Sequence, residues 1–148
     1  MRRSLAWGFV LAVVFASGGW VAADRILVHE RKEVAGLSVL FGAEPEPALD
    51  GEVEFLRWRV TGLADSQPYP NMESAEVTIR LGGGTFGPFP VQSVRADPGL
   101  YQTRHIFTEP GQYQSTLSFR KGEETVVHTV DFEFRINARQ TIELPPRR

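Results

Sequence analysis

The chain has 148 residues, enough for one domain with a sizeable core, and its 42% hydrophobic and 23% charged residues are ordinary for a globular protein. Its formal net charge is −2 and the sequence shows no basic cluster, which excludes a nucleic-acid-binding protein. It has no cysteine, which excludes thiol catalysis, thiolate metal sites and disulfides, while an oxidising compartment stays permitted.

Residues 1–23 have the pattern of an export signal. Arg2 and Arg3 precede an apolar run, and small residues before Asp24 suit cleavage after Ala23. The alternative is an uncleaved hydrophobic helix, because residues 4–23 are uncharged and long enough to span a bilayer. Both alternatives predict a protein body outside the cytoplasm, either periplasmic or secreted, and the second adds a membrane anchor.

The first half of the body predicts three strands from its apolar runs, namely Arg25–Glu30, Val34–Phe41 and Val53–Thr61. In the third run the apolar face changes partway along. Phe55 is at an odd-numbered position, whereas Leu56 and Trp58 are at even-numbered positions. A β-bulge near Phe55-Leu56 would reconcile the two faces. The acidic, proline-containing stretch 44–47 reads as a stiff solvated connection rather than a recognition element.

The second half alternates more regularly. One face alternates at every second position in three runs, 77–81, 113–119 and 126–136, and is apolar except at Ser115 and His128; Gly- or Pro-rich turns separate these runs. No segment after Ala23 has a helical period. Seven or eight short strands in residues 24–140 predict an all-β, antiparallel β-sandwich, with a small barrel as the second architecture, followed by a C-terminal tail of residues 141–148.

A six-residue phrase occurs twice, first as Pro98–Thr103 and then as Pro110–Ser115. In each copy the proline and glycine suit a turn, and a tyrosine follows where a new strand begins. An acidic residue, a glycine and then a tyrosine at this spacing resemble the start of strand F in immunoglobulin-like folds, where the tyrosine hydroxyl bonds to backbone. The predicted structural residues are Gly99, Tyr101, Gly111, Tyr113 and the core tryptophan Trp58. Tyr113 is the better corner tyrosine, because a clean strand follows it.

Longer stretches extend this resemblance. "VAGLSVLFGAEPEPALDGE", "RVTGL" and "DPGLYQTRHIFTEPGQYQSTLSF", after a signal peptide, make the chain similar to the YtkA-like exported domains over most of residues 34–137. The resemblance implies an immunoglobulin-like β-sandwich and a loose association with copper handling outside the cytoplasm.

Three residues are candidate metal ligands: His105, His128 and Met72. Nitrogen and sulfur ligands of this kind would favour copper. The chain shows no His-x-His or Met-rich spacing, and the structural alternative places both histidines on the inner face of the sandwich. We therefore expect His128 to be a neutral ring held by a hydrogen bond.

The stretch 82–90, "GGGTFGPFP", reads as a hairpin rather than a phosphate loop, since it has no Gly-Lys-Ser/Thr ending and no following helix. Phe86 and Phe89 are expected to cap the core, with a contact surface as the alternative. No catalytic phrase is visible, and no cofactor is indicated. The sequence predicts an exported, non-catalytic binding or accessory domain whose partner is a protein or small ligand, with a copper-binding protein as the alternative.

Overall fold

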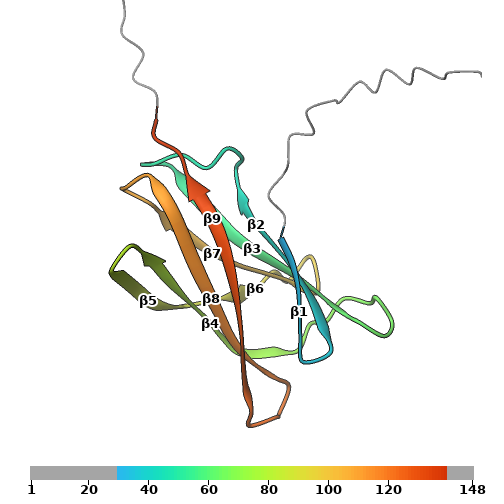
Figure 1. The fold of residues 1–148 in the computed structure, drawn as a ribbon. Helices are drawn as coiled ribbons and strands as arrows, with labels where there is room; N and C mark the ends of the chain where they lie inside the picture. The colour runs from blue at the N-terminus through green and yellow to red at the C-terminus, as the bar shows by residue number, and fades with distance from the viewer. Residues whose placement is uncertain (1–29, 140–148) are drawn as a thin grey trace, which may run out of the picture.

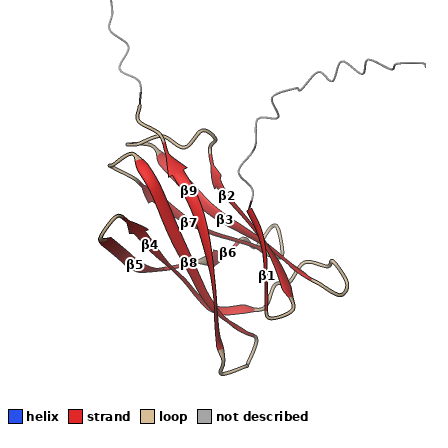
Figure 2. Ribbon diagram, viewed as in Figure 1, coloured by secondary structure: helices blue, strands red, loops and turns tan. Residues whose placement is uncertain are grey.

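The computed structural model of the chain describes residues 30–139, which contain strands, turns and no helix (Figure 2). The strands are β1 (Glu30–Val34), β2 (Leu37–Glu44), β3 (Val53–Gly62), β4 (Met72–Leu81), β5 (Gly84–Pro90), β6 (Gln92–Ser93), β7 (Leu100–Ile106), β8 (Gly111–Lys121) and β9 (Val127–Ile136). The predicted signal peptide, most of the predicted strand Arg25–Glu30 and the tail 141–148 lie outside the described residues. Within the described part, no helix is long and apolar enough to cross a membrane.

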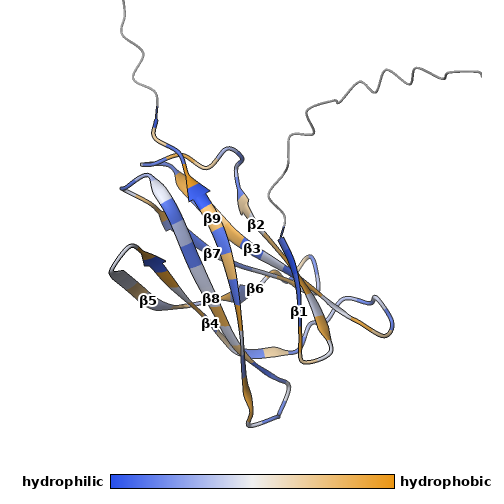
Figure 3. Ribbon diagram, viewed as in Figure 1, coloured by the Kyte–Doolittle hydropathy of each residue, from blue (hydrophilic) through white to orange (hydrophobic). Residues whose placement is uncertain are grey.

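The strands form two antiparallel sheets, one in the order β1-β2-β3-β7-β6 and the other in the order β5-β4-β8-β9 (Figure 1). The two sheets pack face to face over a common core, so the predicted all-β sandwich is confirmed. Inward-facing apolar residues alternate with polar ones, as the banding of β9 shows in Figure 3. The largest fully buried side chains of the core are those of Trp58, Tyr101, Phe41, Phe119 and Phe132.

Two sequence expectations are wrong in this part of the chain. The run Val34–Phe41 is not one strand, because β1 and β2 form a hairpin around Ala35-Gly36. Both turn residues have positive φ, 51° and 75°, which is the geometry of a two-residue hairpin turn. Alanine rarely adopts positive φ, and this is why the turn was hidden in the sequence.

The predicted bulge near Phe55-Leu56 is also absent. β3 keeps a continuous register with β2 and with β7, so its even-numbered residues face inward from Glu54 onward. Phe55 faces outward, where the Arg57 guanidinium lies 5.3 Å from its ring centroid. The sequence pattern was misleading because a carboxylate, Glu54, occupies a core position.

The two ends of the sandwich are distinguished by the two tyrosines of the repeated phrase. We call the end where β7 starts the Tyr101 end; the β1–β2 turn and the β8–β9 hairpin also lie there. β7 runs from it to the opposite end, where β8 starts and which we call the Tyr113 end. The connection 45–52 also lies at the Tyr113 end, where the main-chain N–H of Gly51 donates to the carbonyl of Phe107 at 2.7 Å. The stretch 44–47 thus joins neighbouring strands, and its residues are exposed as predicted.

The two sides of the sandwich differ as well. On one side β1 and β9, the edge strands of the two sheets, are bridged. Lys32 Nζ donates to the carbonyl of Asp131 at 2.6 Å, and the N–H of Glu133 donates to Glu30 Oε2 at 3.4 Å. On the other side, β5 of one sheet faces β7 and the short β6 of the other, and the structure gives no hydrogen bond between them within residues 30–139.

Candidate functional site: an aromatic pocket at the Tyr113 end

A pocket of about 150 Å³ opens between the two sheets at the Tyr113 end, on the side where β5 faces β7. We call it the aromatic pocket. It is lined by Ile79, Phe86, Phe89, His105, Ile106, Phe107, Thr108 and Tyr113. Two of these side chains, Phe86 and Ile106, are 50% and 58% exposed and belong to different sheets. Apolar surface is therefore presented to solvent on both sides of a concave apolar site.

The rings of the pocket are held by contacts with one another. The Phe89 ring meets the His105 ring edge-on with centroids 4.7 Å apart, and His105 is 5.8 Å from Phe107. Phe107 in turn meets Tyr113 edge-on at 4.9 Å, and Tyr113 stacks on Phe134 of β9 at 5.4 Å. Tilted and offset arrangements of this kind are the favoured ones for aromatic pairs. The chain of rings joins the pocket to the core and fixes its shape in advance.

His105 is, with Tyr113, one of the two titratable groups among residues 30–139 that line this pocket. Its ring is half-buried, and burial lowers the pKa of the imidazole, which is therefore neutral at neutral pH. Its Nε2 lies 3.1 Å from the hydroxyl of Thr103, two residues earlier on the same face of β7. The pocket is thus apolar with one neutral polar edge.

A buried carboxylate lies on the strand next to His105. Glu54 of β3 pairs directly with His105 across the sheet, and its side chain is fully buried. Glu54 Oε1 accepts a 3.3 Å hydrogen bond from the main-chain N–H of Leu49, while Oε2 has no hydrogen-bond partner. Burial raises the pKa of this carboxyl group, the Leu49 N–H opposes that rise, and the charge of Glu52 adds to it.

The structure does not bring the three predicted metal ligands together. His105 lies at the Tyr113 end, whereas His128 pairs with Phe119 and Met72 pairs with Lys121, both at the Tyr101 end. Tyr113 and Phe119 are six positions apart on β8, and at about 3.3 Å per residue the two ends that hold the two histidines lie about 20 Å apart. Metal ligands must converge to about 2 Å from the ion, so these histidines cannot share one. Residues 30–139 contain no group of three His, Asp or Glu side chains that could hold a metal.

His128 faces the inner side, as predicted, with its ring 5.7 Å from that of Phe119. The expected hydrogen bond is absent, because its buried Nε2 lies 3.5 Å from Glu124 Oε2 and has no hydrogen-bond partner within the described part of the chain. That expectation was wrong for a local reason. His128 is the second residue of β9, which begins at Val127, and its ring is only partly buried at the edge of the core.

The three aromatic residues predicted to be structural, Trp58, Tyr101 and Tyr113, lie in the core. Trp58 is fully buried and packs on Phe41 at 5.6 Å, and its indole Nε1 has no hydrogen-bond partner in the described residues. Tyr113 is 4% exposed, and its hydroxyl donates to the carbonyl of Glu109 at 2.7 Å, four residues upstream. The prediction that the Tyr113 hydroxyl bonds backbone before its strand is therefore confirmed.

Tyr101 also bonds backbone, but across the sandwich. Its hydroxyl donates to the carbonyl of Tyr69 at 2.9 Å and accepts from the N–H of Met72 at 3.1 Å. Met72 is the first residue of β4 in the other sheet, so the buried hydroxyl of Tyr101 joins β7 to the start of β4 in the opposite sheet. The sequence favours Tyr113 over Tyr101 as the corner tyrosine, because the long-range partners of Tyr101 have no signal in the residues around it.

The expected hairpin at 82–90 is confirmed, and its two phenylalanines behave differently. β4 and β5 pair up to Leu81 and Gly84, with Gly82-Gly83 as the turn. Phe89 packs against the core as a cap, whereas Phe86 is half-exposed at the pocket. Three pocket features were missed by sequence reasoning: the Thr103 contact, the exposed Ile106 and the buried Glu54. Of these, only Ile106 had a signal, an apolar residue at an outward position of its strand.

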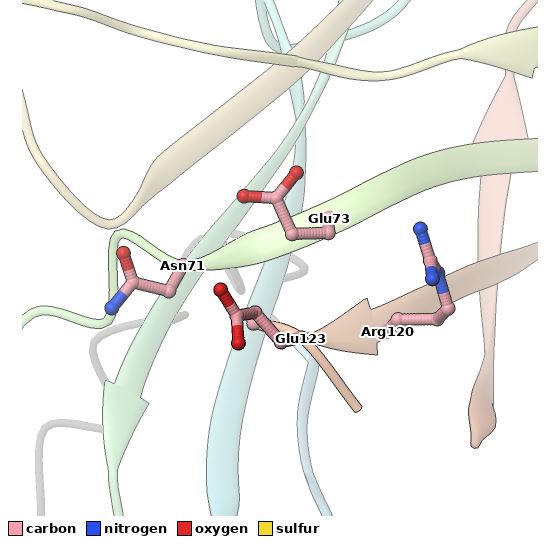
Figure 4. A pocket seen from close by; sticks show the side chains of 5 residues that line it. Asn71, Glu73, Arg120 and Glu123 are labelled. Carbon is pink, nitrogen blue, oxygen red and sulfur yellow. The ribbon is translucent and has the colours of Figure 1, made fainter. Parts of the chain in front are cut away.

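A larger hollow of about 560 Å³ lies at the Tyr101 end and is lined by Asn71, Glu73, Arg120, Gly122 and Glu123 (Figure 4). Its carboxylates are exposed, and Arg120 lies apart from them, where it donates to the hydroxyl of Ser74 at 2.9 Å. The hollow is a solvated surface without a buried polar group directed into it. The aromatic pocket is thus the better candidate site.

Comparisons with protein-family models, with curated proteins and with solved structures give no match to this chain.

Proposed function

We propose that this chain is an exported, non-catalytic binding domain with an immunoglobulin-like β-sandwich, similar to the YtkA-like domains, and that it binds its ligand or partner at the aromatic pocket. The export signal in residues 1–23 supports the location outside the cytoplasm. The corner tyrosine Tyr113 and the buried Trp58 support the immunoglobulin-like form.

One observation carries the binding role: a preformed apolar pocket, lined mainly by aromatic rings, stays open to solvent beside the half-exposed side chain of Phe86. Concave apolar sites with few polar groups are the usual form of sites for small ligands and for anchoring side chains. The volume is suitable as well, since an apolar cavity of about 150 Å³ is large enough to bind benzene.

A catalytic role is less well supported, although Thr103 and His105 lie within the distance of a nucleophile and its base. Such a pair needs a third group that orients the histidine. Glu54 stands opposite His105, but no hydrogen bond or ion pair joins the two side chains, and Glu54 Oε1 bonds to Leu49 instead. We therefore assign Thr103 to holding the His105 ring.

The copper-binding alternative has no comparable support from the geometry. It would need ligands other than the pair His105 and His128, which lie at opposite ends of the sandwich. Titration of the full chain with Cu(I) remains a direct check of that alternative.

The pocket assignment is tested by nuclear magnetic resonance titration of the full chain with toluene. We expect amide shift changes confined to the residues of the aromatic pocket. Phe86→Ser should weaken this binding at least threefold. Val126→Ser is the matched control, because Val126 is a 58% exposed apolar residue at the Tyr101 end, and it should leave binding unchanged. Shift changes spread over both ends, or none, would contradict the assignment.

Export is tested separately by fusing alkaline phosphatase, which is active only outside the bacterial cytoplasm, to the C-terminus. We expect an active fusion, and an inactive one after removal of residues 1–23. A fusion that is inactive with residues 1–23 present would contradict the proposed location.

A further inference from the structure

One strand edge beside the aromatic pocket is unpaired. β3 pairs with β7 along its whole length, from Leu100 to Ile106, but on the other side β6 pairs only with Tyr101 and Gln102. Within residues 30–139, no strand covers positions 103–106 on that side. β7 therefore ends in a stretch of open edge.

The direction of the main-chain groups on this edge follows from the hydrogen bonds at the two ends of β7. The carbonyl of Leu100 accepts from Val94 on the β6 side, whereas the carbonyl of Phe107 accepts from Gly51 on the β3 side. Because these directions alternate along a strand, the N–H and C=O groups of Arg104 and Ile106 face the open side. Two donors and two acceptors are thus available for a further strand.

The facing edge strand does not offer the same opportunity. β5 contains Pro88 and Pro90, which have no main-chain N–H, and prolines of this kind protect edges from further pairing. β1 and β9 are bridged to each other by side chains, as described above. β7 consequently combines an unprotected edge with an adjacent pocket.

A groove follows this edge. It has a volume of about 530 Å³ and shares Phe89 and His105 with the aromatic pocket; its other lining residues are Phe55, Pro90, Gln92, Gln102, Thr103 and Arg104. The groove therefore leads along the open edge to the apolar pocket. An extended chain lying in it would direct alternate side chains inward, toward the pocket, and outward, beside Arg104.

Among the described residues, the only charged side chain that lines the groove is the positive one of Arg104. No carboxylate lines it, and Arg104 is exposed and has no ion-pair partner among residues 30–139. The arginines on the neighbouring strand are already engaged, Arg57 with Glu44 and Arg59 with Asp97. An occupant with a carboxylate at the outward position would complete the pairing at Arg104.

We propose that the open edge of β7 and the aromatic pocket form one site for an extended, apolar and acidic segment of a partner protein. The segment adds as an antiparallel strand beside Arg104 and Ile106, places an aliphatic side chain in the aromatic pocket and sets a carboxylate against Arg104. This inference rests on the proposed binding function of the pocket and adds the class of partner.

The probe is a capped pentapeptide of alternating outward and inward residues, threonine–valine–glutamate–valine–threonine, titrated into the full chain and followed by amide shifts and calorimetry. We expect saturable binding with shifts at positions 103–107 and in the pocket. Methylation of the glutamate N–H should weaken binding at least tenfold, because that N–H would bond to the carbonyl of Arg104. Replacing glutamate with lysine should weaken it similarly, and Arg104→Glu should reverse this preference.

A protein variant tests the edge itself. Ile106→Pro removes an edge-facing N–H without breaking a bond to β3, so the fold should persist by circular dichroism while peptide binding falls at least tenfold. Gln114→Lys on β8, a partly buried polar position away from the edge, is the control and should bind normally. Equal binding of the parent and the N-methylated peptide would overturn strand addition.

Two further outcomes would overturn the choice of occupant, and two would overturn strand addition. If the free protein dimerises and Ile106→Pro makes it monomeric, the occupant is a second copy of the chain. If only a chain ending at Arg139 binds the peptide, residues 140–148 are the occupant. If toluene binds and the peptide does not, strand addition fails while the proposed pocket function stands; if neither binds, both fail.

Discussion

At each end of the sandwich a tyrosine follows a proline–glycine turn, and its hydroxyl donates to a main-chain carbonyl, of Tyr69 for Tyr101 and of Glu109 for Tyr113. The Tyr101 hydroxyl also accepts from Met72 and so joins the two sheets. The Tyr113 hydroxyl makes only its local bond, and its ring lines the aromatic pocket. The same six-residue motif therefore gives one end at which a tyrosine hydroxyl links the two sheets and one end at which the tyrosine ring lines a pocket. The difference arises from the residues that each tyrosine contacts in the other sheet.

The largest expected loss of unfolding free energy comes from replacing the glycine before each tyrosine, and it should differ between Gly99 and Gly111. At Gly99, φ is +84° and an added Cβ would lie 2.9 Å from the main-chain oxygen of Val60. Gly99→Ala should cost about 3 kcal/mol, from a strained left-handed conformation and a clash with backbone. At Gly111, φ is +154°, which also disfavours alanine, but the nearest atom is Leu81 Cδ1 at 3.0 Å, a flexible side-chain end; Gly111→Ala should therefore cost about 2 kcal/mol, from backbone strain without a clash against backbone. Urea unfolding of both variants measures this; equal losses would erase the contrast between the ends.

Removing each hydroxyl should sharpen the comparison. Tyr101→Phe leaves the buried N–H of Met72 and the partly buried C=O of Tyr69 without partners and should cost about 2–3 kcal/mol. Tyr113→Phe removes one bond to the carbonyl of Glu109, an exposed residue, and should cost about 1 kcal/mol. Chemical denaturation of the two variants tests the order, and a larger loss for Tyr113→Phe would reverse our account of which end is fastened.

A smaller effect is expected from pH at the Tyr113 end. Burial raises the pKa of Glu54 above its unfolded value of 4.5, so the folded state favours the protonated form. The unfolding free energy should therefore be highest below pH 4.5 as far as this group is concerned, and should fall as pH rises through the raised pKa. Glu54→Gln should remove this dependence and raise the melting temperature at pH 7. A variant less stable than the parent at pH 7 would show that the carboxylate is better satisfied than its free Oε2 indicates.

The smallest effect should come from exposed apolar residues. Phe86→Ser at the Tyr113 end and Val126→Ser at the Tyr101 end should each change the unfolding free energy by less than about 0.5 kcal/mol, because both side chains are half-exposed. Thermal melts check this. A large loss for Phe86→Ser alone would mean that Phe86 supports the core, and its effect on binding would then need a second variant.

Much of the fold was predictable because strand alternation and turn residues are local signals. The period-two pattern located the second half of β4, most of β8 and all of β9, and the repeated six-residue motif located the starts of β7 and β8. The Ala35-Gly36 turn was missed because alanine gives no positive-φ signal, and the bulge was wrongly predicted because a buried glutamate imitates an outward position.

The site was far less predictable, since it depends on which strands become neighbours. Phe89 and His105 were both noticed in the sequence, but their 4.7 Å contact arises only when β5 and β7 face each other from different sheets. The cross-strand pairing of Glu54 with His105 likewise depends on the register of β3 against β7. Neither relation has a signature in the residues adjacent to it.

The pairing of β3 with β7 also bears on how the chain folds. Partners such as Val53 and Ile106 are about fifty residues apart, and β4 pairs with β8 over a comparable separation. Closing such long loops before any contact stabilises them slows folding, and β-sandwiches rich in non-local pairs fold in milliseconds to seconds. We therefore expect a chain with this topology to stay unfolded for milliseconds to seconds after synthesis, and the export proposed above would have to begin within that interval.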